Sequence, residues 1–189
     1  NHNGNGWGHN DGGDDGTGEY VNLGGYNQSN DVFEGGAGTD TLQMTSGNDA
    51  LFLHDDVSDG DSDVRISGVE VIEAGDGDDI IDLTSDTYSY GDVTLDGGDG
   101  NDTLWSNAGD DVLLGGAGND HLYGSAGDDT LTGGTGWDEF QIGKADGHDI
   151  VTDFTPGEDI IDLSEWNYNN FNQIQNDMHL DTDGNVGIE

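Results

Sequence analysis

The stretch GGAGNDHLY, residues 115–123, decides how this chain folds, because near-copies of it stand on both sides at a spacing of nine residues. Five units run without a slip over residues 97–141: GGDGNDTLW, SNAGDDVLL, GGAGNDHLY, GSAGDDTLT and GGTGWDEFQ. Position 4 of every unit is Gly, position 6 is Asp, and position 8 is Leu or, in the last unit, Phe. Glycines at this spacing permit tight turns, and the three residues that end each unit can form a short strand.

Two units make one coil of the chain, with two strands and two turns, and stacked coils bury the position-8 side chains in a thin core. A second, looser block shares a register over residues 26–34, 35–43 and 44–52, and an isolated unit occupies residues 74–82. The sequence therefore predicts an all-β fold. We expect a parallel β-roll or β-solenoid with inserted β excursions and a C-terminal capping segment.

The charge of the chain is extreme. Asp and Glu number 42 against two basic residues, Arg65 and Lys144, for a formal net charge of −40. A compact state at that charge repels itself unless cations offset it. The same balance argues against nucleic acid as a partner, since a nucleic-acid binder needs a basic surface. No cysteine is present for a disulfide or a cysteine zinc site, and no apolar run is long enough for membrane insertion.

The position-6 carboxylates show which cation is needed. Side chains two units apart lie on the same edge, one coil above another, and at the strand spacing of about 5 Å they repel. Carboxylates together with turn carbonyls offer about six oxygens, which suits calcium better than magnesium. The candidate metal ligands of the regular units are Asp102, Asp111, Asp120, Asp129 and Asp138. Those of the earlier units are Asp31, Asp40, Asp49 and Asp79.

The pattern GGxGxDxUx, with U a large apolar residue, resembles the repeat of RTX proteins, whose parallel β-roll binds calcium. The resemblance is close over residues 97–141 and looser over 26–52. It implies several Ca²⁺ ions as cofactors. It also implies export by type I secretion to the extracellular space or the bacterial cell surface, where calcium orders the chain.

An acidic loop adds a separate candidate. Asp59, Asp61 and Asp63 have the spacing of the first three ligands of an EF-hand loop, and Glu70 falls at its twelfth position. Val64 stands where the sharp turn of that loop needs glycine, which argues against a helix–loop–helix hand. A calcium-stabilised loop and a solvated acidic loop both stay open.

The repeats divide the chain into five parts. They are an N-terminal linker or cap (1–25), a first, irregular solenoid part with the acidic loop (26–82), an insertion (83–96), the regular β-roll (97–141) and a C-terminal cap (142–189).

The sequence offers no catalytic constellation. HExxH, GxSxG and P-loop motifs and a cysteine nucleophile are missing, and the six histidines are dispersed. A glycosidase needs an acid held in an apolar cleft, and calcium-bound carboxylates do not provide one. We expect that the chain is not an enzyme.

Long excursions break the array, and aromatic residues and acidic loops concentrate in them. In this the chain resembles the peptide-binding domains of large RTX adhesins. The resemblance implies a calcium-dependent module for cell attachment and biofilm formation, which holds a peptide's C-terminal carboxylate through calcium. A chain of charge −40 repels carboxylates unless an incompletely coordinated calcium presents positive charge.

Four aromatic residues are the candidate ligand contacts: Tyr88, Tyr90, Trp105 and Tyr123. Trp105 and Tyr123 both stand at position 9, in units two apart, so we expect them on one face. The alternative is an RTX folding and secretion block that binds only calcium. Under both readings we expect a monomeric segment of a larger chain.

Overall fold

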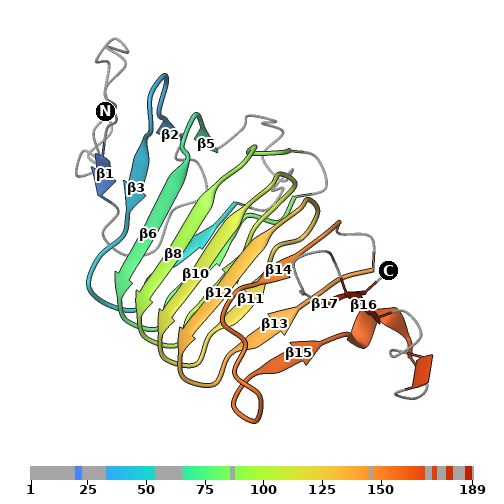
Figure 1. Ribbon diagram of the computed structural model, residues 1–189. Helices are drawn as coiled ribbons and strands as arrows, with labels where there is room; N and C mark the ends of the chain where they lie inside the picture. Colours follow the sequence, from blue (N-terminus) through green and yellow to red (C-terminus); the bar gives the residue numbers. More distant parts are fainter. Residues whose placement is uncertain are drawn as a thin grey trace, which may run out of the picture.

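The structure is a computed structural model of the 189-residue chain, and it describes residues 20–22, 33–53, 66–85, 88–144, 147–168, 172–173, 178–180 and 186–188. The chain winds through two facing sheets, one strand of each per coil (Figure 1). Neighbouring strands within both sheets are parallel. The predicted all-β parallel β-roll is confirmed.

The seven-stranded sheet has the order β1-β3-β6-β8-β10-β12-β14. Its strands are β1 (Tyr20–Asn22), β3 (Thr41–Gln43), β6 (Val71–Asp76), β8 (Thr94–Asp99), β10 (Val112–Ala117), β12 (Thr130–Thr135) and β14 (Ile150–Val151). The six-stranded sheet has the order β15-β13-β11-β9-β7-β4. Its strands are β4 (Ala50–Phe52), β7 (Ile80–Asp82), β9 (Thr103–Trp105), β11 (His121–Tyr123), β13 (Glu139–Gln141) and β15 (Ile160–Asp162).

Shorter elements lie outside these sheets. β2 (Phe33–Glu34) pairs with β5 (Ile66–Ser67) in parallel, and a 3-10 turn, η1 (Ser164–Trp166), follows β15. β16 (Met178–Leu180) and β17 (Val186–Ile188) pair antiparallel, as a hairpin requires.

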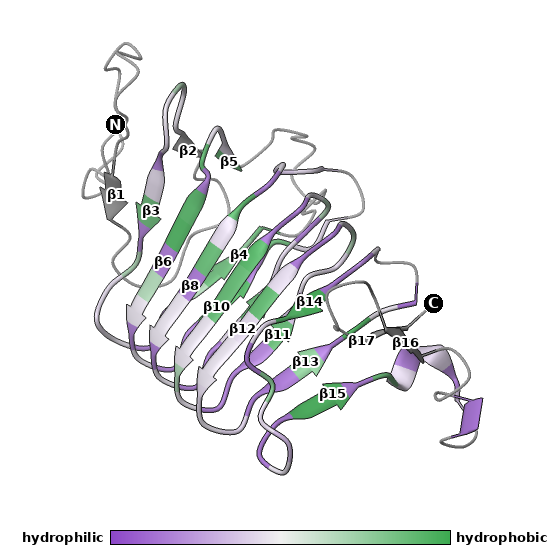
Figure 2. Cartoon of the chain, viewed as in Figure 1, coloured by the Kyte–Doolittle hydropathy of each residue, from purple (hydrophilic) through white to green (hydrophobic). Residues whose placement is uncertain are grey.

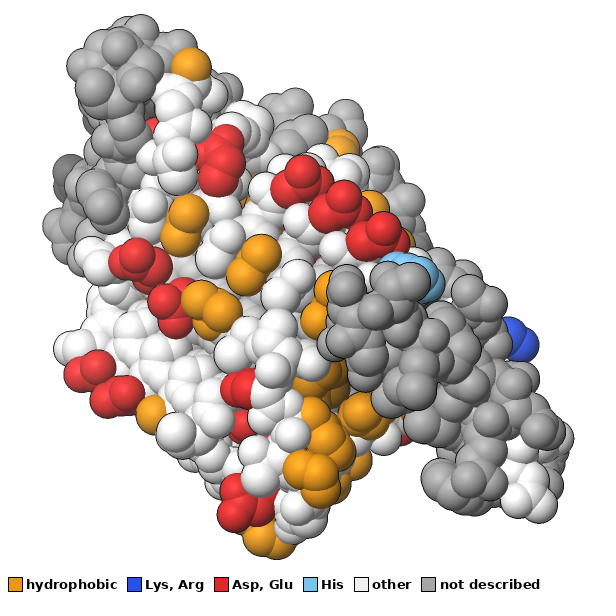
Figure 3. Space-filling view, viewed as in Figure 1, with side chains coloured by type: hydrophobic (Ala, Val, Ile, Leu, Met, Phe, Trp, Pro, Cys, Tyr) orange, Lys and Arg blue, Asp and Glu red, His pale blue; other side chains and the backbone are white. Residues whose placement is uncertain are grey.

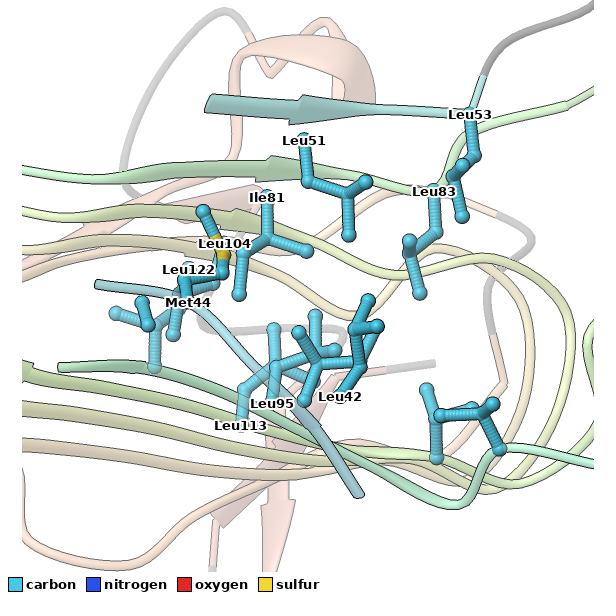
Figure 4. Packing of buried hydrophobic residues seen from close by; sticks show 14 of the residues in the cluster. Leu42, Met44, Leu51, Leu53, Ile81, Leu83, Leu95, Leu104, Leu113 and Leu122 are labelled. Carbon is cyan, nitrogen blue, oxygen red and sulfur yellow. The ribbon is translucent and has the colours of Figure 1, made fainter. Parts of the chain in front are cut away.

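The core is a double row of position-8 side chains, as the sequence predicts. Leu42, Leu95 and Leu113 from the seven-stranded sheet face Leu51, Ile81 and Leu104 from the six-stranded sheet (Figure 4). The strands alternate between buried and half-exposed residues, so each coil adds one apolar side chain per sheet. Hydrophobic colour accordingly falls in short bands along the strands, and the turns are hydrophilic (Figure 2).

The roll is regular only in part. Corresponding aspartates of successive coils are 18 residues apart from Asp102 to Asp120. They are 30 residues apart from Asp49 to Asp79 and 23 apart from Asp79 to Asp102. Extra residues therefore leave the roll between these coils. The acidic loop stands in the first of these two gaps, and the second gap ends just before Tyr88.

The expected insertion over residues 83–96 is shorter than the sequence suggests. Its last residues enter β8, and Val93 and Leu95 are buried in the core. The reason is a degenerate unit, YSYGDVTLD at residues 88–96, which keeps Gly91 at position 4 and Leu95 at position 8 but has Val93 in place of aspartate.

The segment expected as a C-terminal cap, 142–189, begins with another coil. β14 and β15 extend the two sheets in parallel. Units KADGHDIVT (144–152) and FTPGEDIID (154–162) keep Gly at position 4 and Asp at position 6 after slips of two residues and one residue. Ile160 and Ile161 of this last coil are 54% and 41% exposed, so capping by the residues beyond 162 stays a prediction.

The N-terminal segment, 1–25, also contributes to the roll. β1 within it pairs with β3 in parallel, Tyr20 opposite Thr41. The roll therefore begins before residue 26 on that side. The remaining residues of the segment lie outside the described part of the chain.

Candidate metal centre

A ladder of aspartates runs along one edge of the roll, where the chain passes from the seven-stranded to the six-stranded sheet. We call it edge 1. The main-chain N–H of each aspartate donates to Oδ1 of the aspartate one coil further on, at N···O distances of 2.7–3.1 Å. The members are Asp49, Asp79, Asp102, Asp120, Asp138 and Asp159.

The opposite edge, edge 2, carries a second ladder with one break. Asp40 donates its main-chain N–H to Oε2 of Glu70 at 2.9 Å, so Glu70 takes the place of a position-6 aspartate. The next member is Val93, which has no carboxylate to offer. The ladder resumes with Asp111, Asp129 and Asp149.

The second carboxylate oxygen needs a cation in the middle of these ladders. Oδ2 is buried and has no hydrogen-bond partner in Asp79, Asp102, Asp111, Asp120 and Asp129. At the two ends of edge 1, Oδ2 of Asp49 accepts hydrogen bonds from Thr45, and Oδ2 of Asp159 accepts the Thr155 N–H. Burial raises the pKa of Asp102 and Asp129 to about 7 and that of Asp120 to about 6. A buried anionic oxygen without a partner is costly, and a bound cation removes that cost.

The glycine at position 1 leaves room for such a cation. A Cβ added to Gly97 would stand 2.5 Å from Asp102 Oδ2 and 2.7 Å from the Gly115 carbonyl oxygen. A Cβ on Gly115 would meet Asp120 Oδ2 at 2.5 Å and the Gly133 carbonyl oxygen at 2.6 Å. We call each such corner a cradle. It combines a carboxylate with a main-chain carbonyl, the oxygen donors that calcium prefers.

Side chains alone do not complete a site. Over the described residues, no three His, Cys, Asp or Glu side chains form a group that could hold a metal. Main-chain carbonyls must therefore supply a large share of the ligands, as the cradles indicate.

A family comparison agrees with this geometry. The model of the RTX calcium-binding nonapeptide repeat matches in four copies, at residues 27–52, 66–86, 89–113 and 114–140, which together span more than half of the chain. The chain is a member of the RTX calcium-binding repeat family. It therefore binds several Ca²⁺ ions, and the β-roll is a structural calcium-binding fold. A search among curated proteins finds no match to the chain.

The RTX turns carry a further, exposed ladder at position 5. Asp110 donates its main-chain N–H to Asp92 Oδ1, and Asp128 donates to Asp110 Oδ1, both at 3.0 Å. On edge 1, hydrogen bonds from Asn101 lower the pKa of Asp78. Figure 3 shows acidic side chains in a row along the rim of the roll. Asparagine and aspartate both occur in this ladder, so these side chains act by hydrogen bonding one turn to the turn of the next coil.

The structure describes only some of the predicted calcium ligands, and it places one of them differently from the prediction. Asp31, Asp59, Asp61 and Asp63 lie outside the described residues. The EF-hand spacing predicts Glu70 as the last ligand of the acidic loop, but the structure places it in the edge 2 ladder. Sequence reasoning missed Asp149 and Asp159, the last members of the two ladders. The signal that could have found them is the pair Gly147 and Gly157, two residues before each aspartate.

The four aromatic candidates lie in two places. The Tyr90 hydroxyl donates to the Leu53 carbonyl oxygen at 3.0 Å, and its ring packs against the core. Tyr88 is half-buried nearby in the sequence. Trp105 and Tyr123 stand opposite each other on β9 and β11, on one face as expected. The Trp105 ring meets His121 edge-on, with centroids 5.9 Å apart.

The described residues include no helix that is both long and apolar enough to span a membrane.

Proposed function

We propose that this RTX roll is a calcium-dependent ligand-binding module of a large type I-secreted bacterial adhesin. It acts at the extracellular cell surface in attachment and biofilm formation, and it holds the C-terminal carboxylate of a peptide through bound calcium. Its own calcium is held by position-6 carboxylates along both edges other than Asp111, with Glu70 in the place of one of them. It acts as a monomeric part of a longer chain and catalyses no reaction.

The observation that carries this proposal is the pair of excursions. Successive coils are separated by 30 and then 23 residues where the regular roll needs 18. A roll that bound calcium only in order to fold needs no such additions. One excursion leaves the roll after Leu53 and the other after Leu83. These two points lie on adjacent coils, since the Leu53 N–H donates to the Asp82 carbonyl oxygen. The two excursions therefore begin side by side.

Charge supports a calcium-bridged carboxylate. The 42 acidic residues repel an anionic peptide terminus over the whole surface, so binding needs a local positive centre. A calcium ion with an open coordination position is such a centre. We place it in the loop of Asp59, Asp61 and Asp63, with Tyr88 beside the peptide. Tyr90 instead anchors the base of the excursion through Leu53.

A peptide screen tests the proposal. Short peptides with free or amidated C-termini are titrated into the protein in calcium and again in excess chelator. We expect binding only in calcium and only to free carboxylates. The variant Asp59→Asn/Asp61→Asn/Asp63→Asn should lose the peptide and keep the roll, whereas Asp99→Asn, at an exposed position 3, should bind normally. Equal binding of amidated peptides would contradict the carboxylate mechanism.

The second candidate is a folding and secretion block that binds only calcium. The edge 1 ladder favours it, because it joins all the coils from Asp49 to Asp159 and needs nothing but the cation. A folded, calcium-loaded protein that binds no peptide in the screen would support this alternative.

A further inference from the structure

Within the regular roll, edges 1 and 2 differ at position 1 of their units. On edge 1 this residue is Gly97, Gly115 or Gly133, and each leaves an open cradle. On edge 2 the unit SNAGDDVLL begins with Ser106, which is fully buried. The corner between this unit and the unit one coil further on, which begins at Gly124, therefore contains a side chain where edge 1 has space.

The Ser106 side chain uses the oxygens of the cradle. Its hydroxyl donates to the Gly124 carbonyl oxygen, which is the counterpart of the Gly115 carbonyl in the Gly97 cradle. The counterpart of Asp102 is Asp111, whose Oδ2 is buried without a hydrogen-bond partner, and the Ser106 side chain lies beside this carboxylate. The serine thus occupies the position between carboxylate and carbonyl that a cation would take.

The coil before Ser106 also lacks a calcium site on this edge. Its position-6 residue is Val93, which is 3% exposed and has no carboxylate. The Val93 N–H still donates to Asp111 Oδ1 at 2.8 Å, so the coils stay in register. Of these two successive corners of edge 2, the first therefore lacks the carboxylate, and the second lacks the open space beside its carboxylate.

Side-chain hydrogen bonds hold the same region together. Asn107 Nδ2 donates to the Leu83 carbonyl oxygen at 2.9 Å, and Ser125 Oγ donates to the Ser106 carbonyl oxygen at 3.0 Å. With the bond from Tyr90 to Leu53, these contacts join edge 2 to the two residues after which the excursions leave. Direct hydrogen bonds fix this part of the roll.

We propose that the middle of edge 2, from Val93 to Asp111, binds no calcium and is closed by side-chain hydrogen bonds instead. Within the regular coils, the RTX roll then carries its calcium asymmetrically, along edge 1 at the corners of Gly97, Gly115 and Gly133, and along edge 2 only beyond this seam. The inference concerns the roll itself and holds whether or not the chain binds a peptide.

Calcium stoichiometry tests the seam. Bound calcium is counted by equilibrium dialysis in high salt and excess magnesium, which suppress weak surface binding. Ser106→Gly opens the corner, so we expect one more ion than in the unchanged protein. Ser106→Ala removes the hydroxyl but keeps a Cβ in the corner and should gain none. On edge 1, the reverse change Gly97→Ser should lose one ion.

The inference is overturned if Ser106→Gly folds normally and gains no ion, or if Gly97→Ser keeps the full number. A second measurement does not depend on how the variants fold. In crystals of the unchanged protein soaked with a lanthanide, anomalous peaks should mark the Gly97 and Gly115 corners, and none should appear between Ser106 and Gly124. A peak at that corner would equally overturn the inference.

Discussion

The position-6 aspartate uses its two oxygens differently. In Asp102, Asp120 and Asp129, Oδ1 accepts a main-chain N–H from the preceding coil, and Oδ2 lies in the cradle without a protein partner. Asparagine could make the first contact but lacks the charge for the second. This explains why Asn101 and Asn119 occur in the exposed position-5 ladder, where only the hydrogen bond is needed. At position 6, the residue type follows from the cation.

Replacing Asp120 by alanine should therefore weaken calcium binding more than replacing Asp99, which is exposed at position 3. Asp120→Ala removes a cradle oxygen, and we expect the affinity of at least one site to fall about tenfold or more. Asp99→Ala removes only a surface charge. Isothermal titration calorimetry with calcium compares the two variants, and equal losses would show that position 6 is not the ligand position.

At the scale of the strand, glycine allows the coils to approach closely. Gly98, Gly116 and Gly134 stand in register on β8, β10 and β12, where the long strands run into edge 1. Gly116 has φ of 106°, and an added Cβ would lie 2.0 Å from the Gly98 carbonyl oxygen. A side chain here would push two coils apart at the ladder, so the strand depends on glycine for its geometry.

Gly116→Ala should destabilise the calcium-loaded protein by at least about 2 kcal/mol, because it adds both backbone strain and a clash. Gly47→Ala is the matched control, since a Cβ at Gly47 meets no atom within 4 Å. The control should be neutral or stabilising by about 0.5 kcal/mol. Urea denaturation in saturating calcium measures both effects. Similar midpoints for the two variants would contradict the close packing of the coils.

The molecule as a whole has a thin core and a large negative charge. Each coil buries about one position-8 side chain per sheet, while 42 acidic residues lie in the same 189-residue chain. Burial raises the pKa of Asp102 and Asp129 to about 7 and that of Asp120 to about 6, well above the ordinary 3.8. Without calcium at neutral pH, the folded chain must either keep these groups protonated or bury their negative charge. Both cost free energy, so the folded state without calcium is disfavoured relative to the unfolded state.

In excess chelator at pH 8 we expect the β circular-dichroism signal to be largely lost. Between about pH 4 and pH 7 the folded state binds more protons than the unfolded state, so its stability falls as pH rises. Lowering the pH from 8 to 5 in chelator should therefore restore part of the β signal. In calcium the affinity should fall over the same range, because protons compete for Oδ2. A native β spectrum in chelator at pH 8 would contradict this account.

The repeat by itself determined the fold class, the calcium and the core. Each unit needs Gly at position 4 for the turn, Asp at position 6 for the metal and an apolar residue at position 8 for the strand. These requirements are local, so the residues recur at a fixed period that can be recognised in the sequence. The units at 88–96, 144–152 and 154–162 were harder to recognise, because their register slips or a key residue is replaced.

Only the tertiary structure decided which coils lie next to one another. Spacings of 30 and 23 residues hide the neighbours of Asp79, and the period cannot predict that Glu70 joins a ladder or that Val93 interrupts one. The role of Ser106 is also invisible in the sequence, because it depends on the Gly124 carbonyl of the next coil. The period of nine residues reflects the requirements of each single coil. The contacts between coils depend instead on where the excursions leave the roll.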